Sequence, residues 1–424
     1  MALIAALLFV LFLALSIPIA ASLGLASLIA VLVTNKVPLV IVSQMVYASA
    51  DSFSLMAIPF FMLAGTVMEA GGLSRRLINF ANCVVGGTTG GLGAIAVLTS
   101  MFFAAISGSG PATVAALGTI LIPAMMEAGY DAAYASALMA TAGAIGIVIP
   151  PSIPMVVYGV QSDVSVGALF LGGFLPGILF GGALLAYNYV RSKHQQWGGT
   201  SRPSLREAML AAKDALPALL TPVIILGGIY GGVFTPTEAA AVAVVYGVMV
   251  GRFVYKELDW GKFPKALVDA GINSAVVVLI IMGASIFSWI IVSENVPALL
   301  VDLVRSISQS SVVVLLLINI LLLIAGCLLD ASSAIIVLTP LLLPVIKAFN
   351  VDPLHFGIIM VVNLAVGLIT PPVGLDLYVA AGIAKLSLEQ ISRAVVPLIV
   401  VTIVALLVTT YVPSLSLALP HLLK

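Results

Sequence analysis

The chain has 424 residues, of which 62% are hydrophobic and only 8% are charged, and its 17 basic residues balance its 17 acidic ones. A soluble domain carries about 25% charged residues, so this composition excludes an ordinary soluble protein, and no basic run indicates nucleic-acid binding. Stretches of roughly 20 apolar residues, the length that a helix needs to cross a bilayer, occur along the chain. We therefore expect an all-α polytopic membrane protein.

Residues 1–190 form the first of two halves. The N-terminal stretch has no basic region and no polar cleavage region, so it is interpreted as a retained helix and not as a signal peptide. Two apolar segments joined by a tight polar tip at 107–111 are typical of a re-entrant hairpin. In chain order we expect scaffold spans within 1–69 (2–17, 18–34 and 55–69), an arm at 74–86, the hairpin at 90–126, a helix at 132–162 broken at 149–154, and a span at 166–190.

Residues 215–424 form the second half, after a polar linker at 191–214 that is expected to be cytoplasmic. The same order of elements is expected to recur. It comprises scaffold spans within 215–293 (215–231, 237–253 and 274–293), an arm at 297–307, a hairpin at 311–346 with its tip at 330–333, a helix at 354–384 broken at 370–374, and a span at 394–412.

The two halves share turn-forming residues at a constant offset of 221 positions. The matched pairs are Pro123 and Pro344, Asp131 and Asp352, Gly146 and Gly367, and Pro150-Pro151 and Pro371-Pro372. The other residues of the two segments differ. Two segments that share a backbone path but no longer share side-chain contacts are expected to keep their turn-forming residues in common. Repeats whose hydrophobic segments are broken at corresponding places indicate a transporter's binding site, and we expect the repeats to be inverted in the membrane.

The distribution of basic residues supports this topology. If neither hairpin crosses, the N-terminus and the C-terminus lie outside, and only Lys36, Arg305, Lys347 and Lys424 among the basic residues fall outside. The remaining basic residues fall on the inner side, as the positive-inside rule requires. Treating either hairpin as one straight crossing would reverse the membrane orientation of every later segment and weaken the positive-inside bias.

The hairpin tips and helix breaks are the candidate sites. An unpaired backbone group in hydrocarbon costs several kcal/mol, so a broken helix is tolerated where its free groups face protein, water or a ligand. Free carbonyls suit a hard cation such as sodium, and free amides suit an anion. The tip at 107–113 with the break at 146–152 would form one cation site, and 326–333 with 367–373 would form the other, with the substrate between them.

Several polar residues allow a structural interpretation as well. Ser109 and Asp330 both precede the second arm of a hairpin, where either could act only as an N-cap. Asp330 is also an ionisable residue at membrane depth, which favours a function, and Asp376 is a weaker candidate of the same kind. Glu238 is expected to cap a helix start. The three histidines and two cysteines have no ligand spacing, so no transition-metal centre and no other cofactor is expected.

The absence of a nucleotide-binding motif favours ion-coupled transport over ATP hydrolysis, and no nucleophile and base pair indicates an enzyme. A channel remains an alternative, but two hairpins that meet at mid-membrane imply occluded sites. A carrier would saturate with substrate and require an ion gradient, which a channel would not.

Five strings carry a family resemblance that runs over essentially the whole chain. They are IPFFMLAG at 58–65, SGSGPAT at 107–113, IPPSIP at 149–154, GVFTPTEAA at 232–240 and TPPVG at 370–374. Together they resemble the large membrane subunit, DctM-like, of tripartite ATP-independent periplasmic (TRAP) transporters. The resemblance implies an elevator-type, sodium-driven importer of small organic acids, with the fold of the ion-transporter superfamily, in the bacterial inner membrane. It also implies two protein partners, a small four-helix membrane subunit and a periplasmic binding protein, besides membrane lipid.

The resemblance also implies which residues bind the ions and the substrate. One sodium site would be formed by Ser107, Gly146, Ile149 and Ser152, and the other by Gly326, Gly367, Thr370 and Val373. Substrate residues would be Ser109, Thr113, Pro151, Asp330, Ser332 and Pro372. Family members carry C4-dicarboxylates, sialic acid, other sugar acids and sulfonates, and these tips would serve any of them. A stand-alone sodium/dicarboxylate carrier without a binding protein is the alternative.

Overall fold

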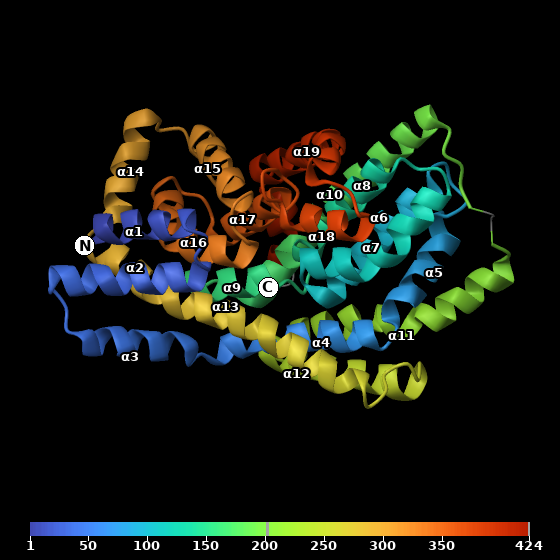
Figure 1. Cartoon of the computed structure of the whole chain (residues 1–424), viewed down its shortest axis with the longest axis horizontal. Coiled ribbons are helices and arrows are strands. Elements are labelled where there is room, and N and C mark those ends of the chain that lie inside the picture. The colour runs from blue at the N-terminus through green and yellow to red at the C-terminus, as the bar shows by residue number, and fades with distance from the viewer. Residues whose placement is uncertain (201–202, 423–424) are drawn as a thin grey trace.

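A computed structural model describes residues 1–200 and 203–422 of the chain, and within these ranges it contains α-helices and no β-strand (Figure 1). Eight of the described helices are long and apolar enough to cross a membrane, or nine if a bent pair counts as one span. The predicted all-α polytopic architecture is therefore confirmed. Arg202 and Lys424, which contribute to the charge distribution, lie outside the described residues.

The first half of the chain is helical throughout its described length, with short connections between the helices. They are α1 (Ala2–Ala14), α2 (Ile19–Thr34), α3 (Leu39–Ala50), α4 (Ala57–Ala70), α5 (Leu73–Val85), α6 (Gly91–Ser107), α7 (Gly110–Glu127), α8 (Ala132–Ala144), α9 (Ile153–Ser162) and α10 (Val166–Gln195). α1 ends earlier than the predicted span 2–17, because the chain turns before Pro18, the residue that precedes the first residue of α2. With 13 residues, α1 is shorter than the roughly 20 residues of a straight crossing.

The second half contains α11 (Leu205–Tyr230), α12 (Pro236–Met249), α13 (Lys262–Ser293), α14 (Val296–Ile307), α15 (Ser311–Gly326), α16 (Ala331–Ala348), α17 (Pro353–Gly367), α18 (Leu375–Ala384), α19 (Leu388–Tyr411) and α20 (Ser414–Leu422). α11 begins before the predicted span 215–231, and α13 begins before the predicted span 274–293. In both helices the first turns are polar, so hydropathy does not include them. Glu238 forms a capping box with Thr235 at the start of α12, so its predicted capping role is confirmed.

The first half of each broken helix, α8 or α17, lies at the centre of the fold. Every residue of α8 from Tyr134 to Ala144 is buried, and so is every residue of α17 from His355 to Gly367. A helix that is apolar on all sides either faces lipid or is surrounded by other helices, and the burial of these residues indicates the second case. Accordingly α8 packs against α6, α7, α18 and α19, while α17 packs against α15, α16 and α19.

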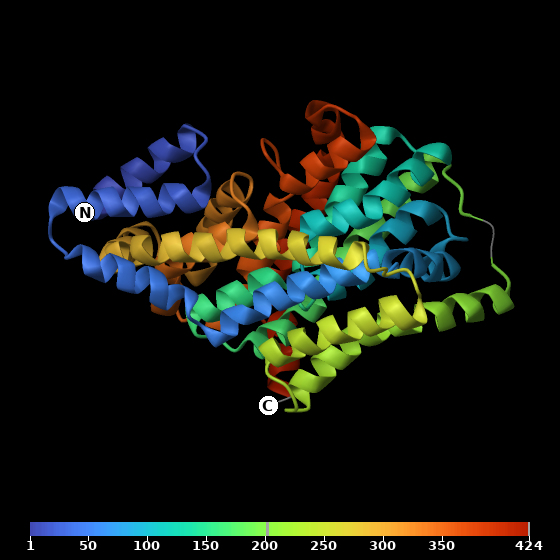
Figure 2. The same cartoon turned by 60° about the horizontal axis from the view of Figure 1, so that its bottom comes forward.

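The longest helix, α13, runs along one side of the molecule and contacts α2 and α4 (Figures 1 and 2). Its backbone approaches α2 closely, because a Cβ atom added to Gly283 would lie 2.6 Å from the carbonyl oxygen of Ala20. Small residues at such crossings are typical of helix packing in membranes, where van der Waals contact replaces the hydrophobic effect. α2, α4 and α13 therefore form one packed layer.

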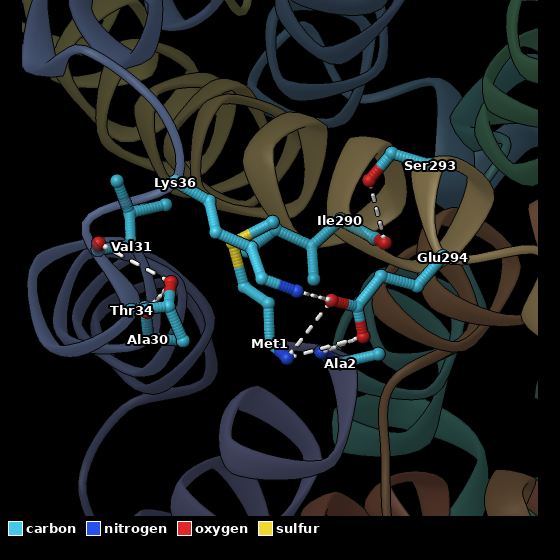
Figure 3. A network of polar contacts seen from close by, with 9 residues as sticks. All are labelled: Met1, Ala2, Ala30, Val31, Thr34, Lys36, Ile290, Ser293 and Glu294. Carbon is cyan, nitrogen blue, oxygen red and sulfur yellow. Dashed lines mark hydrogen bonds and ion pairs between the residues drawn. The ribbon is translucent and has the colours of Figure 1, made fainter.

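Glu294, directly after α13, holds the N-terminal helices to this layer (Figure 3). Its carboxylate accepts hydrogen bonds from the Met1 ammonium at 3.0 Å, from the backbone amide of Ala2 at 2.9 Å, and from Lys36 Nζ at 3.3 Å. The amide of Ala2 and the two cations lower the pKa of Glu294 to about 2. The contacts therefore favour the ionised carboxylate.

Candidate functional site

The first hairpin tip is built on glycine and serine. α6 ends at Ser107, and Gly108 adopts a left-handed conformation with φ 62°, which a residue with a side chain rarely adopts. Ser109 is extended and precedes Gly110 and Pro111, which open α7. The chain thus reverses in two residues between the two arms, as predicted for the tip at 107–111.

The first tip packs directly against the first helix break. The backbone amide of Ile153 donates to the carbonyl of Gly108 at 3.3 Å, and a Cβ atom added to Gly108 would lie 3.0 Å from the carbonyl oxygen of Pro151. A Cβ atom added to Gly146 would lie 2.6 Å from the carbonyl oxygen of Ser109. Only glycine permits this approach. Tip and break are therefore brought together, as the sequence predicted.

Hydroxyl groups at this junction bind one another and backbone carbonyls. The Oγ atoms of Ser107 and Thr113 lie 2.9 Å apart, and Thr113 donates to the carbonyl of Ser109 at 2.7 Å. Ser152 Oγ donates to the carbonyl of Ile147 at 2.6 Å. Oxygen atoms therefore concentrate between the tip and the break, which is the chemistry that a hard cation needs. The side chain of Ile149 packs on Gly177 of α10 instead.

The second tip and break meet in the same manner. A Cβ atom added to Gly367, the last residue of α17, would lie 2.6 Å from the Cα atom of Gly326, the last residue of α15. Thr370 Oγ1 donates to the carbonyl of Val366 at 2.7 Å. The two ends that the sequence assigns to the second cation site are thus in van der Waals contact.

Asp330 begins α16 and caps it. Its Oδ2 atom accepts from the backbone amide of Ser333 at 3.0 Å, and its Oδ1 atom accepts from the hydroxyl of Ser333. The carboxylate also lines two cavities, the central cavity described below and a smaller one of about 190 Å³ that Gly326 and Val373 line with it. Capping and ligand binding are therefore compatible at this residue, because a carboxylate has more acceptor sites than the cap uses.

A cavity of about 520 Å³, here called the central cavity, lies between the two halves of the chain. Both tips, both breaks and the helices α4 and α13 line it. The tip and break residues are Ser107, Gly108, Ser109, Ile147 and Ile153 from the first half and Asp330, Ala331, Ser332, Leu368 and Leu375 from the second. This volume suits a small organic molecule.

The predicted substrate residues divide into two groups. Ser109, Asp330 and Ser332 line the central cavity, and so does Ser107 of the first predicted sodium site. Thr113 is fully buried behind the first tip, and Pro151 is buried beside Gly108. Pro372 is exposed, and it does not line the central cavity.

Three polar residues of the cavity wall were missed by the sequence reasoning. Thr66 and Glu69 lie on α4, and Asn273 lies on α13. The available signal was Glu69, an ionisable residue in an apolar span, which is a functional candidate by default. Glu69 and Asp330 are the charged side chains that line the central cavity, and no basic side chain lines it among the described residues.

Asp376 lies behind the cavity wall. Its side chain is fully buried, and neither carboxylate oxygen has a hydrogen-bond partner within the described part of the chain. A Cβ atom added to Gly110 would lie 2.8 Å from its Oδ2 atom, so the carboxylate faces the first turn of α7. Asp376 thus connects the second break with the first hairpin.

A family model described as "Tripartite ATP-independent periplasmic transporter, DctM component" matches residues 6–415. The chain belongs to the DctM family. This is a family of transport permeases and not of enzymes.

Named relatives extend this assignment. The chain is 50% identical over 410 residues to the isethionate TRAP transporter permease protein DctMQ of Oleidesulfovibrio alaskensis, covering 96% of this chain but 65% of that relative, slightly under two thirds of its length. It is 43% identical over 400 residues to the C4-dicarboxylate TRAP transporter large permease protein DctM of Pseudomonas aeruginosa, covering 94% of each chain.

A solved structure shares the fold of this DctM-family chain. The crystal structure of the Alcanivorax borkumensis YdaH transporter matches with a TM-score of 0.65 and 17% identity, covering 96% of this chain and 97% of that one. At this identity the likeness concerns the fold alone.

Proposed function

We propose that this chain is the large permease subunit of a sodium-coupled importer that moves a small organic acid across the bacterial inner membrane. The observation that carries the proposal is the central cavity of about 520 Å³, to which both hairpin tips and both helix breaks contribute. A single cavity between two repeat-related ends suits one substrate flanked by two ions. The substrate class is a C4-dicarboxylate, sialic acid, a related sugar acid or a sulfonate such as isethionate, as the relatives' names suggest.

Sodium explains how an anion could enter a cavity lined by Glu69 and Asp330. A carboxylate placed beside these two acidic side chains is repelled, and at effective dielectric constants near 20 a pair of unit charges 4 Å apart interacts by about 4 kcal/mol. A bound cation at each tip offsets this repulsion. Gly146 against Ser109 and Gly367 against Gly326 supply backbone oxygen atoms at the two places where such ions are needed.

The proposed mechanism is an elevator. The hairpins and broken helices α6–α9 and α15–α18, here called the transport block, would move as one body against a scaffold of α1–α4 and α11–α13. A small four-helix membrane subunit would hold the scaffold, a periplasmic binding protein would deliver the substrate, and both termini would be periplasmic. The inverted repeats and the cytoplasmic linker at 191–214 belong to the same proposal.

The test is uptake by purified protein in proteoliposomes with both partner proteins. Uptake of succinate or isethionate should require inward sodium and depend on more than one sodium ion per substrate. Uptake driven equally well by a proton gradient without sodium would refute the coupling. Full sodium-driven uptake without any binding protein would favour the stand-alone carrier.

The elevator is tested by cysteines at Ser109 and Ser332, compared with one at Ala243 of α12. Both tip cysteines should change their accessibility from the two sides of the membrane as sodium and substrate vary, whereas the scaffold cysteine should not. One-sided accessibility of both tips under all conditions would indicate a channel or a static gate instead.

A further inference from the structure

A second cavity of about 480 Å³ adjoins the central cavity. The two cavities share Thr66 and Glu69 of α4, so these two residues form the neck between them. The second cavity lies between helices of the scaffold and of the first hairpin, since Ala266 of α13 and Ala116 of α7 both line it. The two cavities therefore adjoin at Thr66 and Glu69, and together they are here called the passage, with the hairpin tips at one end.

One face of α13 lines the whole passage. Lys262, Lys265, Ala266 and Asp269 line the second cavity, and Asn273, Val276 and Val277 line the central one. Spacings of three and four residues place these side chains on one helix face. From Lys262 to Val277 the face is about 22 Å long, at 1.5 Å per residue. α7 follows it on the opposite wall, from Pro111 to Ile120.

The charge changes along this passage. The tip end carries Asp330, the neck carries Glu69, and the far end carries Arg75, Lys262 and Lys265. Two further acidic residues line the second cavity. Glu257 is already engaged, because Arg76 lies 2.8 Å from its carboxylate, whereas Asp269 forms no ion pair with a described residue, so the three basic side chains outnumber the unpaired Asp269 at this end. Arg75 and Lys265 form no ion pair with any described residue.

We propose that the second cavity is an anion subsite on the release path, where Arg75 and Lys265, assisted by Lys262, bind the carboxylate or sulfonate group of the departing substrate. The inference rests on the proposed function for the identity of the substrate. The charge order supports it, because the only basic side chains that line the passage are at the end away from the tips, within the described residues. The positive-inside distribution assigns these three residues to the cytoplasmic side.

The acidic side chains at the tips and the neck determine the direction in which the substrate moves. An anion at the tips is held beside sodium, and when sodium leaves, Asp330 and Glu69 repel the anion. Arg75 and Lys265 attract it at the far end. Loss of sodium therefore drives the substrate past Glu69 toward the cytoplasm and disfavours its return. The subsite itself needs no sodium, since its own cations supply the charge.

The independence from sodium permits a direct test. The double variant Arg75→Gln/Lys265→Gln removes both unpaired cations, and both side chains are exposed, so the fold is retained. Lys213→Gln on α11 is the matched control, because Lys213 is exposed and lines neither cavity. Potassium succinate and potassium isethionate serve as probes, against potassium chloride of equal ionic strength.

In sodium-free buffer, succinate or isethionate should raise the thermal unfolding temperature of the wild type and of Lys213→Gln. The apparent affinity should fall about tenfold in the double variant, because two charge-assisted contacts are lost. The variant Arg75→Lys/Lys265→Arg, which keeps both charges, should retain most of the wild-type affinity. In proteoliposomes the double variant should take up substrate more slowly, with unchanged half-saturation by sodium.

Equal binding and equal turnover in the double variant and in Lys213→Gln would overturn the subsite. A wild type that binds the probes in potassium but shows no sodium-driven uptake would instead refute the proposed function and leave the subsite supported. Binding by the wild type only in sodium would place all anion recognition at the tips and would also overturn the subsite.

Discussion

Gly367→Ala is the substitution that best tests the contact between the second break and the second hairpin. The added Cβ atom would lie 2.6 Å from the Cα atom and 2.8 Å from the carbonyl oxygen of Gly326. Both are backbone atoms, so no side-chain rotation relieves the overlap, and α15 and α17 must separate. Overpacking of this kind costs about 1–3 kcal/mol.

Gly382→Ala is the matched control. Gly382 also lies in a helix of the transport block, but a Cβ atom there meets nothing within 4 Å. Replacing a helical glycine by alanine stabilises a helix by up to about 1 kcal/mol, and this gain applies to both variants. The difference between them therefore isolates the contact with Gly326.

The assay is thermal unfolding of the purified proteins, followed by sodium titration of uptake. We expect Gly367→Ala to be less stable than Gly382→Ala by about 1–3 kcal/mol. If the strain falls on the sodium-bound form, the sodium affinity decreases about 5- to 150-fold. Equal unfolding temperatures of the two variants would refute the packing argument, and equal sodium affinities would show that the strain does not fall on the sodium-bound form.

Three further predictions concern carboxylates. Asp330→Ala should abolish uptake while lowering stability by about 1 kcal/mol, the value of an N-cap, whereas near-normal uptake would leave capping as its only role. Asp376→Asn should raise the thermal unfolding temperature, because an isolated buried carboxylate is costly, and a lower temperature would mean that the carboxylate has a bonding role. The pKa of Glu294 is lowered from 4.5 to about 2, so the stabilising contribution of its carboxylate is complete above pH 4.5 and is lost as the pH falls toward 2. Glu294→Gln should remove this acid dependence from thermal unfolding curves.

Some features of the fold could be predicted from residues alone because they depend on local chemistry. Hydropathy indicated the apolar helices, and glycine, proline and serine marked where they end, as at Gly108 and at the break before Ile153. Helix starts that lie in polar sequence were harder to predict. α13 begins at Lys262 because lysine is a good helix former, while hydropathy registers only the apolar part of the helix.

The prediction that the tips and breaks form one site also came from the sequence, through the offset of 221 positions and the family strings. The approach of Gly146 to Ser109 and of Gly367 to Gly326 then follows from glycine, since any larger residue would collide. The sodium ligands themselves stay a prediction, because backbone carbonyls are present at every position and leave no side-chain pattern.

The sequence by itself determined the membrane class, the order of helices and the four places where the chain breaks, because each follows from hydrophobicity and from the steric limits of nearby residues. Only the tertiary structure decided which distant residues face one another. It brought Asp376 against Gly110. It also placed Glu69 of α4 between the central cavity, which Asp330 lines, and the second cavity, which Arg75 and Lys265 line. Such proximity depends on how whole helices pack, and packing between elements far apart in the chain has no periodic signature in one sequence.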